Sequence, residues 1–564
     1  MKILGINCVY HESSAALITD GNVVAAAEEE RFNRVKHGKP ALVSNADLLP
    51  ERAMAFCLER AGIAPKELDL VAIAFEPRLR RDTFRLDPLS VPGDWGSAEG
   101  EADFQAGLAR IPERLSGLLG VDCEASIRWI PHHLAHAACA YYPCGEDGAA
   151  VLVVDGIGES ATALLGGGHG VLIESHDELS YPQSVGFVWE KLSAYLGFSP
   201  YDASKVMGLA SYGNPRTCTT ALAEIVGDGP EPAVRNEALE FRLPDFDALE
   251  KRFGPRRLPT EPLLERHLDL AAALQSWNDR TILGLAERAH ALHPAQTLCF
   301  SGGVALNCTT NWLLKEEGPF PRVYIPSAPH DGGTAIGAAL AAYYATETVF
   351  PKPATTGCEY TGPEFTGEQI RAAFAQAGIA PRRCPDIARE VARRIAGGEV
   401  VGWFQGRMEL GPRALGNRSL LADPRDPGMR DMLNEKVKHR EAFRPFAPSV
   451  LAERARDWFD LGRDSDSFHY MLFTCPVHPG LAARIPAVVH VDGTSRVQTV
   501  SKDVNPRYHR LISEFEKVTG VPMVLNTSFN DSEPIVCTPA DALATFRTTR
   551  IDAVAVGDYL ATRD

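Results

Sequence analysis

Short apolar runs alternate with longer amphipathic or alanine-rich segments along most of the chain. Short runs rich in Val, Ile and Leu are typical of buried strands, and the longer segments repeat their apolar positions at helical spacing. Such alternation indicates an α/β fold, with helices covering a sheet. In the first part of the chain it predicts strands at Lys2–Asn7, Leu70–Phe75, Ala150–Asp155, Gln296–Phe300 and Val323–Ile325, and helices at Glu51–Ala61, His132–Tyr142, Asp269–His290 and Asp331–Tyr344.

The alternation stops near residues 350–367 and then resumes. The interruption reads FPKPATTGCEYTGPEFTG, which is rich in Pro, Thr and Gly and lacks both the strand and the helix period, as in a linker. We therefore predict a first domain at residues 1–350, a linker at 351–367 and a second α/β domain at 368–564. The second domain should contain helices at Asp386–Ala396, Arg507–Thr519 and Ala540–Thr548, and strands at Val400–Phe404, Pro522–Asn526 and Ala553–Val556.

A weak internal similarity links Ile3–Asn7 with Val151–Gly156, because each is an apolar strand that reaches a polar residue and then a turn. Duplicated units of this kind characterise the actin-like and sugar-kinase ATPases, in which two halves clamp ATP. Many other α/β proteins also contain apolar strands that end in Asp-Gly, so the similarity alone does not settle the fold class.

Composition and charge limit the partners. The chain of 564 residues is long enough for two or more domains, and its net charge of −16 argues against nucleic acid as the main partner. Its 12 cysteines are scattered without a CxxC pair, as in a reducing compartment. The sequence enters a strand at once, and no apolar run reaches the ~20 residues of a membrane span. We expect a cytoplasmic protein with small-molecule partners and no membrane contact; a homodimer is left open.

Two histidines and two aspartates form a candidate metal site. His132 and His136 are four residues apart, so on a helix both imidazoles leave the same face. Asp155 ends an apolar strand, and Asp331 opens a helix after another strand, where ligand sites of open α/β sheets gather. This set suits iron, manganese or zinc. Ordinary buried or capping histidines are an equally good interpretation of the histidine pair alone, and Asp331 could be a helix N-cap.

A glycine turn suggests a nucleotide loop. Ser301–Asn307 follows a predicted strand and precedes a helix, where small residues and free N–H groups can approach an anion. The second strand–turn–helix, at Asp331, strengthens this interpretation. Lys205 is a candidate phosphate contact, although a solvated surface lysine is nearly as good an interpretation.

A basic stretch stands out against the acidic average. Residues 405–445 contain nine Lys or Arg and six Asp or Glu, a local balance of +3. Gly411–Ser419 resembles a rigid turn that presents guanidinium groups, and Arg444 is embedded between Phe443 and Pro445. Arginine forks match phosphate oxygens, and charges set among apolar residues usually have partners. We interpret the stretch as an anion site; the alternative is a solvated charged face.

These segments resemble the NodU/CmcH-type O-carbamoyltransferases of antibiotic and nodulation-factor biosynthesis, over nearly the whole chain and in the same order. The stretches that carry the resemblance are His11–Leu17, Glu28–Phe32, His132–Tyr142, Val153–Gly156, Lys205–Ala210, Ser301–Asn307, Asp331–Ala339, Gly411–Ser419, Lys438–Ser449 and Asn526–Asn530. The resemblance implies an actin-like/sugar-kinase (ASKHA) ATPase domain, related to the threonylcarbamoyl-adenosine synthesis ATPase, followed by a YrdC-like domain. Residues 76–128 and 217–265 carry no recognisable motif.

The resemblance also implies roles for individual residues. His132, His136, Asp155 and Asp331 would carry a divalent metal that touches the ATP phosphates, with Mg²⁺ accompanying ATP as a further option. The nucleotide would lie against Lys205, Gly208, Gly302, Gly303, Asn307 and Gly332. His11 and Lys36 would lie near the acceptor, with His11 as a catalytic group. Carbamoyl phosphate would be held by Arg413, Lys438, Arg444, Arg496, Asn526 and Ser528, and the first three of these would also take part in its cleavage.

The implied reaction moves a carbamoyl group from carbamoyl phosphate, through an ATP-derived carbamoyl-adenylate, to a hydroxyl of a small natural product. Three other functions compete with this one. A tRNA-modifying enzyme that makes threonylcarbamoyl-adenosine is disfavoured by the acidic balance. A sugar kinase would leave the anion site without a purpose. A non-catalytic nucleotide sensor would bind ATP without turnover.

Overall fold

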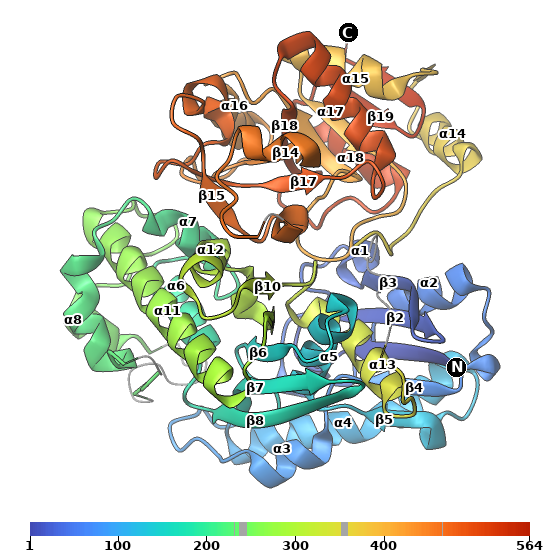
Figure 1. Cartoon of the computed structure of the whole chain (residues 1–564). Helices are drawn as coiled ribbons and strands as arrows, with labels where there is room; N and C mark the ends of the chain where they lie inside the picture. The colour runs from blue at the N-terminus through green and yellow to red at the C-terminus, as the bar shows by residue number, and fades with distance from the viewer. Residues whose placement is uncertain (230–231, 236–244, 351–358, 465, 564) are drawn as a thin grey trace. The chain divides into compact units, whose positions relative to one another are not determined.

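The computed structural model describes residues 1–229, 232–235, 245–350, 359–464 and 466–563. The chain divides into two compact units (Figure 1). Unit 1 comprises Met1–Glu29 and His37–Thr355, and unit 2 comprises Glu30–Lys36 and Thr356–Asp564. Within the predicted linker, residues 351–358 lie outside the described residues. That a short N-terminal segment groups with unit 2 was not predicted from any sequence pattern.

Unit 1 contains two five-stranded sheets of the same design. The first has the order β3-β2-β1-β4-β5 and the second the order β10-β9-β6-β7-β8. In each sheet the first three strands in sequence pair antiparallel, and the last two add in parallel beside the first. The strands are β1 (Lys2–Asn7), β2 (Ser14–Thr19), β3 (Asn22–Glu28), β4 (Leu70–Ile73), β5 (Ile127–Trp129), β6 (Ala150–Val154), β7 (Ala161–His169), β8 (Leu172–Ser180), β9 (Thr297–Ser301) and β10 (Arg322–Tyr324). The repeated order confirms the predicted duplication within an α/β fold.

Two helices lie between these sheets (Figure 1). Helix α13 (Thr334–Tyr344) packs on β1, β2 and β4, while α5 (His132–Cys144) packs on β6 and β9, and the two helices pack on each other. Both contacts depend on glycine: a Cβ on Gly5 would meet the Ala335 carbonyl oxygen at 1.9 Å, and one on Gly337 would meet that of Ala135 at 1.8 Å. The first turns of α5 and α13 are thereby held close together.

The remaining helices of unit 1 surround this centre. The longest, α11 (Glu265–Leu292), packs on α7 (Ala203–Ala210), α8 (Pro215–Val226) and α12 (Cys308–Glu317). Helices α2 (Glu51–Ala61), α3 (Pro77–Thr83), α4 (Ala98–Leu119), α6 (Val185–Tyr195) and α10 (Asp247–Phe253) complete the cover. The predicted helix Glu51–Ala61 is found with the same bounds, and that at Asp269–His290 is longer at both ends.

Unit 2 is built on an eight-stranded mixed sheet with the order β11-β20-β19-β12-β13-β18-β14-β17. The strands are β11 (Arg382–Arg383), β12 (Val401–Phe404), β13 (Arg418–Ala422), β14 (Ala447–Leu451), β17 (Gln498–Val500), β18 (Met523–Ser528), β19 (Ala553–Val556) and β20 (Tyr559–Thr562). Helices α15 (Ile387–Ala396) and α17 (Pro506–Thr519) pack together, as do α14 (Gly367–Gln376) and α18 (Pro539–Thr548). A short ribbon pairs β15 (Thr474–Pro476) with β16 (Thr494–Arg496).

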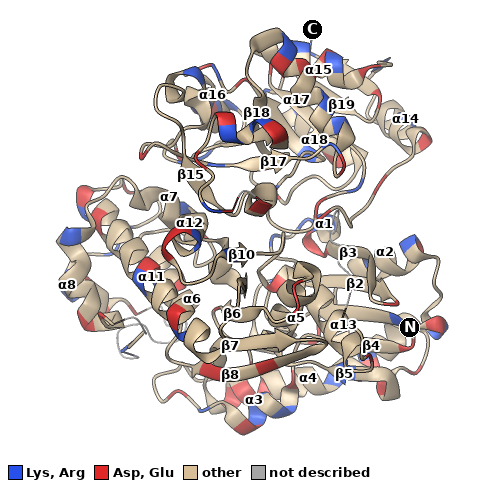
Figure 2. Ribbon diagram, viewed as in Figure 1, with Lys and Arg blue, Asp and Glu red and all other residues tan. Residues whose placement is uncertain are grey.

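Charged residues lie mainly on the outer helices, whereas most strands carry few of them (Figure 2). Strand β8 is an exception, with Glu174, Asp177 and Glu178 along an edge of the second sheet. Charges on an edge strand discourage pairing with another chain. Among the described helices, including the long α11, none combines the length and the apolar character that a membrane crossing requires.

Candidate functional site

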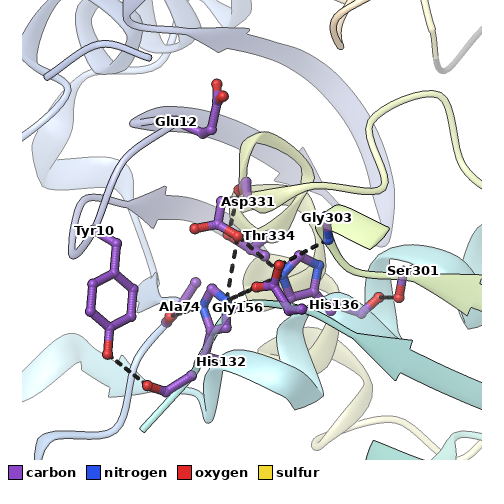
Figure 3. Close-up of polar contacts among 12 residues, drawn as sticks. Tyr10, Glu12, Ala74, His132, His136, Gly156, Ser301, Gly303, Asp331 and Thr334 are labelled. Carbon is purple, nitrogen blue, oxygen red and sulfur yellow. Dashed lines mark hydrogen bonds and ion pairs between the residues drawn. The ribbon is translucent and has the colours of Figure 1, made fainter. Parts of the chain in front are cut away.

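The predicted metal residues converge in unit 1 (Figure 3). His132 and His136 come from the first turns of α5, Asp155 follows β6, and Asp331 lies just before α13. One ligand atom from each of the four lies within 4.8 Å of the other three. The close approach of α5 and α13 at Gly337 is what brings Asp331 to the two imidazoles.

The spacing within this cluster suits one ion. The two Nε2 atoms are 3.2 Å apart, His132 Nε2 lies 3.3 Å from Asp155 Oδ2, and His136 Nε2 lies 3.3 Å from Asp331 Oδ1. Metal–ligand bonds of about 2.1 Å separate neighbouring ligand atoms by roughly 3.0–3.5 Å. The donor set of two imidazoles and two carboxylates therefore fits a divalent transition metal.

Neighbouring groups orient the ligands. His132 Nδ1 lies 3.3 Å from the Ala74 carbonyl oxygen, so this contact would hold a proton on Nδ1 when a metal ion takes the place of the proton on Nε2. The Gly303 N–H donates to Asp155 Oδ1 at 2.9 Å. At the start of α5, the buried Glu159 carboxylate accepts the N–H groups of His132 and Glu76 at 2.9 and 2.7 Å. Such outer contacts fix ligand geometry before any ion binds.

The charges in the cluster compensate one another. Burial alone would lower the pKa of His132, but Asp331 and Asp155 raise it well above the ordinary value. Burial would raise the pKa of Asp155, but hydrogen bonds from His132 and His136 hold it well below its usual range. Without an ion the cluster is thus a set of ion pairs, which a divalent cation would replace.

His11 lies beside this cluster. Its Nδ1 is 3.9 Å from Asp331 Oδ2, and its ring packs edge-on against Tyr201 with 4.9 Å between centroids. Burial lowers the pKa of His11, with Asp331 opposing the effect. Lys36, predicted to lie near the acceptor with His11, is exposed and belongs to the segment that groups with unit 2.

A second buried network lies next to His11 in the sequence. Glu12 Oε1 contacts His37 Nδ1 at 2.5 Å, and His330 Nε2 lies 3.6 Å from Glu12 Oε2 and 3.4 Å from Glu28 Oε1. Burial opposes the charge on His330, but Glu12 and Glu28 raise its pKa to about 9. The distances would also admit a metal ion. The ion pairs account for these contacts without one.

The predicted nucleotide residues are placed as follows. Gly302 has φ 94°, and a Cβ there would lie 2.2 Å from the Val154 carbonyl oxygen, so the turn requires glycine. Gly332 leaves room for His330, since a Cβ would approach its ring to 3.0 Å. Asn307 caps α12 through the Thr310 N–H, and its amide donates to Gln275 Oε1 at 3.0 Å. Its side chain is thus engaged within the protein.

Helix α7 carries the last two nucleotide candidates. Gly208 is buried, and Lys205 Nζ lies 3.0 Å from Asp202 and 5.7 Å from the centre of the Phe198 ring. Lys205 is thereby held in place rather than fully solvated. Its side chain is only 21% exposed, which is low for a lysine without a structural or binding role.

In unit 2, Lys438 is the centre of a buried polar cluster. Its Nζ lies 3.2 Å from Ser528 Oγ, 2.7 Å from Asn530 Oδ1 and 2.8 Å from the Asn530 carbonyl oxygen. Burial, then Arg440 and Arg444, lower the pKa of Lys438 well below its ordinary value. The carboxylates that would normally balance a buried ammonium do not overcome these effects.

Further cations crowd the same region. Burial, then Arg444 and Arg496, lower the pKa of Arg440 to about 9. The Arg496 Nε is buried and has no hydrogen-bond partner among the described residues. We call Lys438, Arg440, Arg444 and Arg496 the cation cluster. Like charges that repel one another in a partly buried place favour the binding of an anion.

Asn526 lies two residues before Ser528, which contacts Lys438, and offers a buried acceptor. Its Nδ2 donates to the Ala414 carbonyl oxygen at 3.1 Å and to Gln498, two residues after Arg496. Its Oδ1 is buried and accepts no hydrogen bond from the described part of the chain. Such an orphaned acceptor suits a ligand N–H donor.

The Gly411–Ser419 motif forms a loop around a buried carboxylate. Glu409 Oε1 accepts the backbone N–H groups of Leu415, Asn417 and Arg418 at 2.8, 2.8 and 3.1 Å. Arg413 is half-buried within this loop. Arg418 is fully buried and donates to backbone carbonyls, among them Gln405 O at 2.5 Å. The conformation of the loop is therefore stabilised by hydrogen bonds to Glu409, and Arg418 contributes further hydrogen bonds that stabilise it.

Comparison with known proteins decides the family. Residues 2–340 match the family model described as "Carbamoyltransferase N-terminus", and residues 392–563 match the one described as "Carbamoyltransferase C-terminus". The chain belongs to the carbamoyltransferase family. The predicted NodU/CmcH-type resemblance is thereby confirmed, and this carbamoyltransferase is a transferase enzyme.

The similar proteins span nearly the whole carbamoyltransferase chain. Nodulation protein NolNO of Sinorhizobium fredii is 37% identical over 571 residues, which covers 98% of this chain and 79% of that protein. Nodulation protein U of Rhizobium tropici is 31% identical over 567 residues, covering 94% and 91% respectively. An uncharacterized protein of Synechocystis sp. is 36% identical over 602 residues, covering 99% and 96%.

Sequence reasoning missed several residues that organise these clusters of the carbamoyltransferase. Arg440 lies in the basic stretch at residues 405–445 but carries no motif of its own. Asn530 is the last residue of the Asn526–Asn530 stretch. Glu409 could have been suspected as a carboxylate just before a glycine-rich turn, which offers free N–H groups. Glu159 has no sequence signal, because its partners His132 and Glu76 are distant in the chain.

Proposed function

We propose that this carbamoyltransferase uses ATP to transfer a carbamoyl group from carbamoyl phosphate to a hydroxyl of a small natural product. The observation that carries the proposal is the pairing of two opposite sites in one chain. Unit 1 holds imidazoles and carboxylates that suit a cation, and unit 2 holds repelling cations that suit an anion. In this scheme residues 1–350 form the transfer domain and residues 368–564 form a YrdC-like carbamoyl-phosphate domain.

Carbamoyl phosphate would bind in unit 2. Its phosphoryl oxygens would accept from the cation cluster and from Arg413, whose guanidinium forks match phosphate. The carbamoyl amino group would donate to Asn526 Oδ1, which is otherwise an orphaned acceptor. Lys438, held by Ser528 and Asn530, would stabilise the charge that develops as carbamoyl phosphate and water give carbamate and phosphate.

Activation would follow in unit 1. A carbamate oxygen would attack the α-phosphorus of ATP, so that pyrophosphate leaves and carbamoyl-adenylate forms. His132, His136, Asp155 and Asp331 would hold iron, manganese or zinc, which would neutralise charge on the nucleotide phosphates. Gly302, Gly303 and Gly332, with Lys205 and Gly208 on α7, would line the nucleotide. Carbamate is short-lived in water, which is a reason for carrying both sites in one chain.

The acceptor step would use His11. The acceptor hydroxyl oxygen would attack the carbamoyl carbon, AMP would leave, and the hydroxyl proton would pass to His11. Burial keeps the pKa of His11 low, so the imidazole is neutral and able to accept a proton near pH 7. We expect His11→Ala to form adenylate normally but to lose transfer to the acceptor. Normal transfer by this variant would remove His11 from the mechanism.

Mass spectrometry of the products tests the proposal as a whole. The protein is mixed with ATP, carbamoyl phosphate, a divalent metal and a panel of alcohols that includes amino sugars and oligosaccharides. We expect an acceptor heavier by one carbamoyl unit, together with AMP, pyrophosphate and phosphate. ADP as the nucleotide product would indicate a kinase, modification of added tRNA would indicate a tRNA enzyme, and binding of ATP without products would indicate a sensor.

A further inference from the structure

The segment Glu30–Lys36, which we call the crossover segment, belongs to unit 2 although both of its chain neighbours belong to unit 1. It begins with one helical turn, α1 (Glu30–Asn33), and continues through Arg34, whose φ is 61°. Non-glycine residues adopt such a left-handed conformation only where their surroundings require it. The contacts of this segment within unit 2 supply that requirement.

Each arginine of the crossover segment binds one loop of the proposed carbamoyl-phosphate site. Arg31 is buried, with 3% of its side chain exposed, and its Nη2 donates to the Gly411 carbonyl oxygen at 3.0 Å. Gly411 opens the loop that carries Arg413 and is organised by Glu409. Glu30 balances the charge of Arg31, since their side chains are 2.6 Å apart. Arg31 thus fixes one end of the Arg413 loop.

Arg34 binds the second loop. Its Nη1 and Nη2 donate to the carbonyl oxygens of Ile535 and Pro534 at 2.7 and 2.5 Å. This stretch follows Asn530, whose Nδ2 donates to the Glu533 carbonyl oxygen at 2.6 Å while its Oδ1 accepts from Lys438. Hydrogen bonds therefore hold the 530–535 loop at one end through Arg34 and at the other end through Lys438.

Apolar packing supports the two arginines. Phe32 packs against a small core of Met408, Ile535 and Cys537, the last of which is 1% exposed. Burial raises the pKa of the Cys537 thiol, and the positive charges of Arg31 and Arg34 are among those that oppose this rise. Both arginines therefore lie close enough to Cys537 to interact with it electrostatically. The carbonyl contacts of Arg31 and Arg34 are directional and uncharged, so they define the positions of the two loops, while Glu30 separately balances the charge of Arg31.

We propose that Arg31 and Arg34 are positioning residues for carbamoyl-phosphate use, by which a segment of the N-terminal half holds the two binding loops of unit 2. The inference rests on the proposed function, because it assigns those loops to carbamoyl phosphate. A misplacement of about 1 Å at a reacting group can lower the rate by about a hundredfold. Loss of either arginine releases one loop while the rest of the cation cluster remains.

The test uses the full chain and compares Arg31→Ala, Arg34→Ala, Arg31→Lys and Arg34→Lys. A matched control is Arg389→Ala, which removes a half-exposed arginine of unit 2 at 3.8 Å from Glu514. We expect the alanine variants to raise the KM for carbamoyl phosphate by about tenfold to a hundredfold. The KM for ATP and the melting temperature should stay near the wild-type values. The lysine variants should recover part of the affinity, since lysine can still donate to one carbonyl.

The outcomes separate the inference from the proposed function. If the wild type does not consume carbamoyl phosphate, the proposed function fails. If the wild type consumes it and Lys438→Met does not, but the arginine variants have a wild-type KM, the function stands and the positioning role is overturned. Equal increases in both KM values, or unfolded alanine variants with fully active lysine variants, would show a structural role only and would also overturn it.

Discussion

The His/Asp cluster of unit 1 and the cation cluster of unit 2 treat buried charge in opposite ways. In unit 1 two imidazoles face two carboxylates, and each sign stabilises the other, so that the pKa of His132 rises and that of Asp155 falls. In unit 2 four cations face one another, and burial with mutual repulsion lowers the pKa values of Lys438 and Arg440. The charges of the first cluster are compensated without a ligand. In the second, Glu441, 3.9 Å from Arg444, does not overcome the lowered pKa values of Lys438 and Arg440.

This difference indicates what each cluster is built to bind. A compensated cluster in which His132 and Asp155 already have orienting contacts can exchange its protons for a metal ion at little structural cost. A repelling cluster with an orphaned Arg496 Nε gains electrostatic stabilisation as soon as an anion enters. Three substitutions and two measurements of proton linkage would break or sharpen the contrast, and they are given in order of decreasing effect.

Removal of the central cation of unit 2 should have the largest effect. We expect Lys438→Met to lower kcat/KM for carbamoyl phosphate by about a thousandfold, because one preorganised donor is worth about that much in a water-excluded site. ATP binding should be unchanged. Lys436→Met is the matched control, since Lys436 is exposed two residues away. A similar loss in both variants would mean that net charge, rather than the buried position, is what matters.

Removal of a unit 1 ligand should act on metal content. His136→Ala leaves three of the four ligand atoms, so the bound metal should fall from about one ion per chain to a small fraction after dialysis. Elemental analysis measures this content, and carbamoyl-phosphate binding should persist in the same protein. His169→Ala, with 88% of its side chain exposed, is the control. Full metal content in His136→Ala would place the ion elsewhere.

A conservative change at Arg496 should have a moderate effect. Arg496→Lys keeps the charge but loses the planar fork that matches a phosphate, so we expect the affinity for carbamoyl phosphate to fall by about tenfold. Isothermal titration with the stable ligand inorganic phosphate checks the same change. An unaltered affinity would show that Arg496 contributes charge alone.

Proton linkage should have opposite signs in the two clusters. Metal binding near pH 7 should release about one proton, because His132 gives up the proton that Asp331 and Asp155 stabilise against burial. Phosphate binding at alkaline pH should be accompanied by proton uptake, because an anion raises the lowered pKa of Lys438. Titration calorimetry in buffers of different ionisation enthalpy measures both. The same sign for the two ligands would contradict the comparison.

Linkage also fixes the pH dependence of stability for Lys438. Because its pKa in the folded chain lies below 10.5, the unfolded chain binds more protons at intermediate pH. The contribution of Lys438 to stability therefore rises with pH until the unfolded side chain also titrates, and saturating phosphate should flatten this dependence.

Much of the fold could be predicted from local patterns. Strand β1 and helix α2 were predicted with their observed bounds, because each combines a clear period with an end signal such as Gly62. Strands β2, β3 and β7 were missed. They are rich in alanine and glycine, which have low strand propensity, and only their pairing with neighbouring strands makes them strands.

The candidate sites were predictable to the extent that their residues lie in short motifs. The spacing of His132 and His136 on one helix placed two ligands, and the strand ends placed Asp155 and Asp331. Contacts between distant segments gave no such signal: Arg31 and Gly411 are 380 residues apart. The grouping of residues 30–36 with unit 2 therefore became apparent only in three dimensions.

The crossover segment also sets an order for folding during synthesis. Arg34 leaves the ribosome 501 residues before its partner Ile535, which at typical elongation rates is a delay of roughly 25 to 100 s. Throughout that interval Phe32 has no core to enter, while the strands on either side of the segment can already pair. The N-terminal sheet therefore forms before Phe32 can pack against Met408, Ile535 and Cys537.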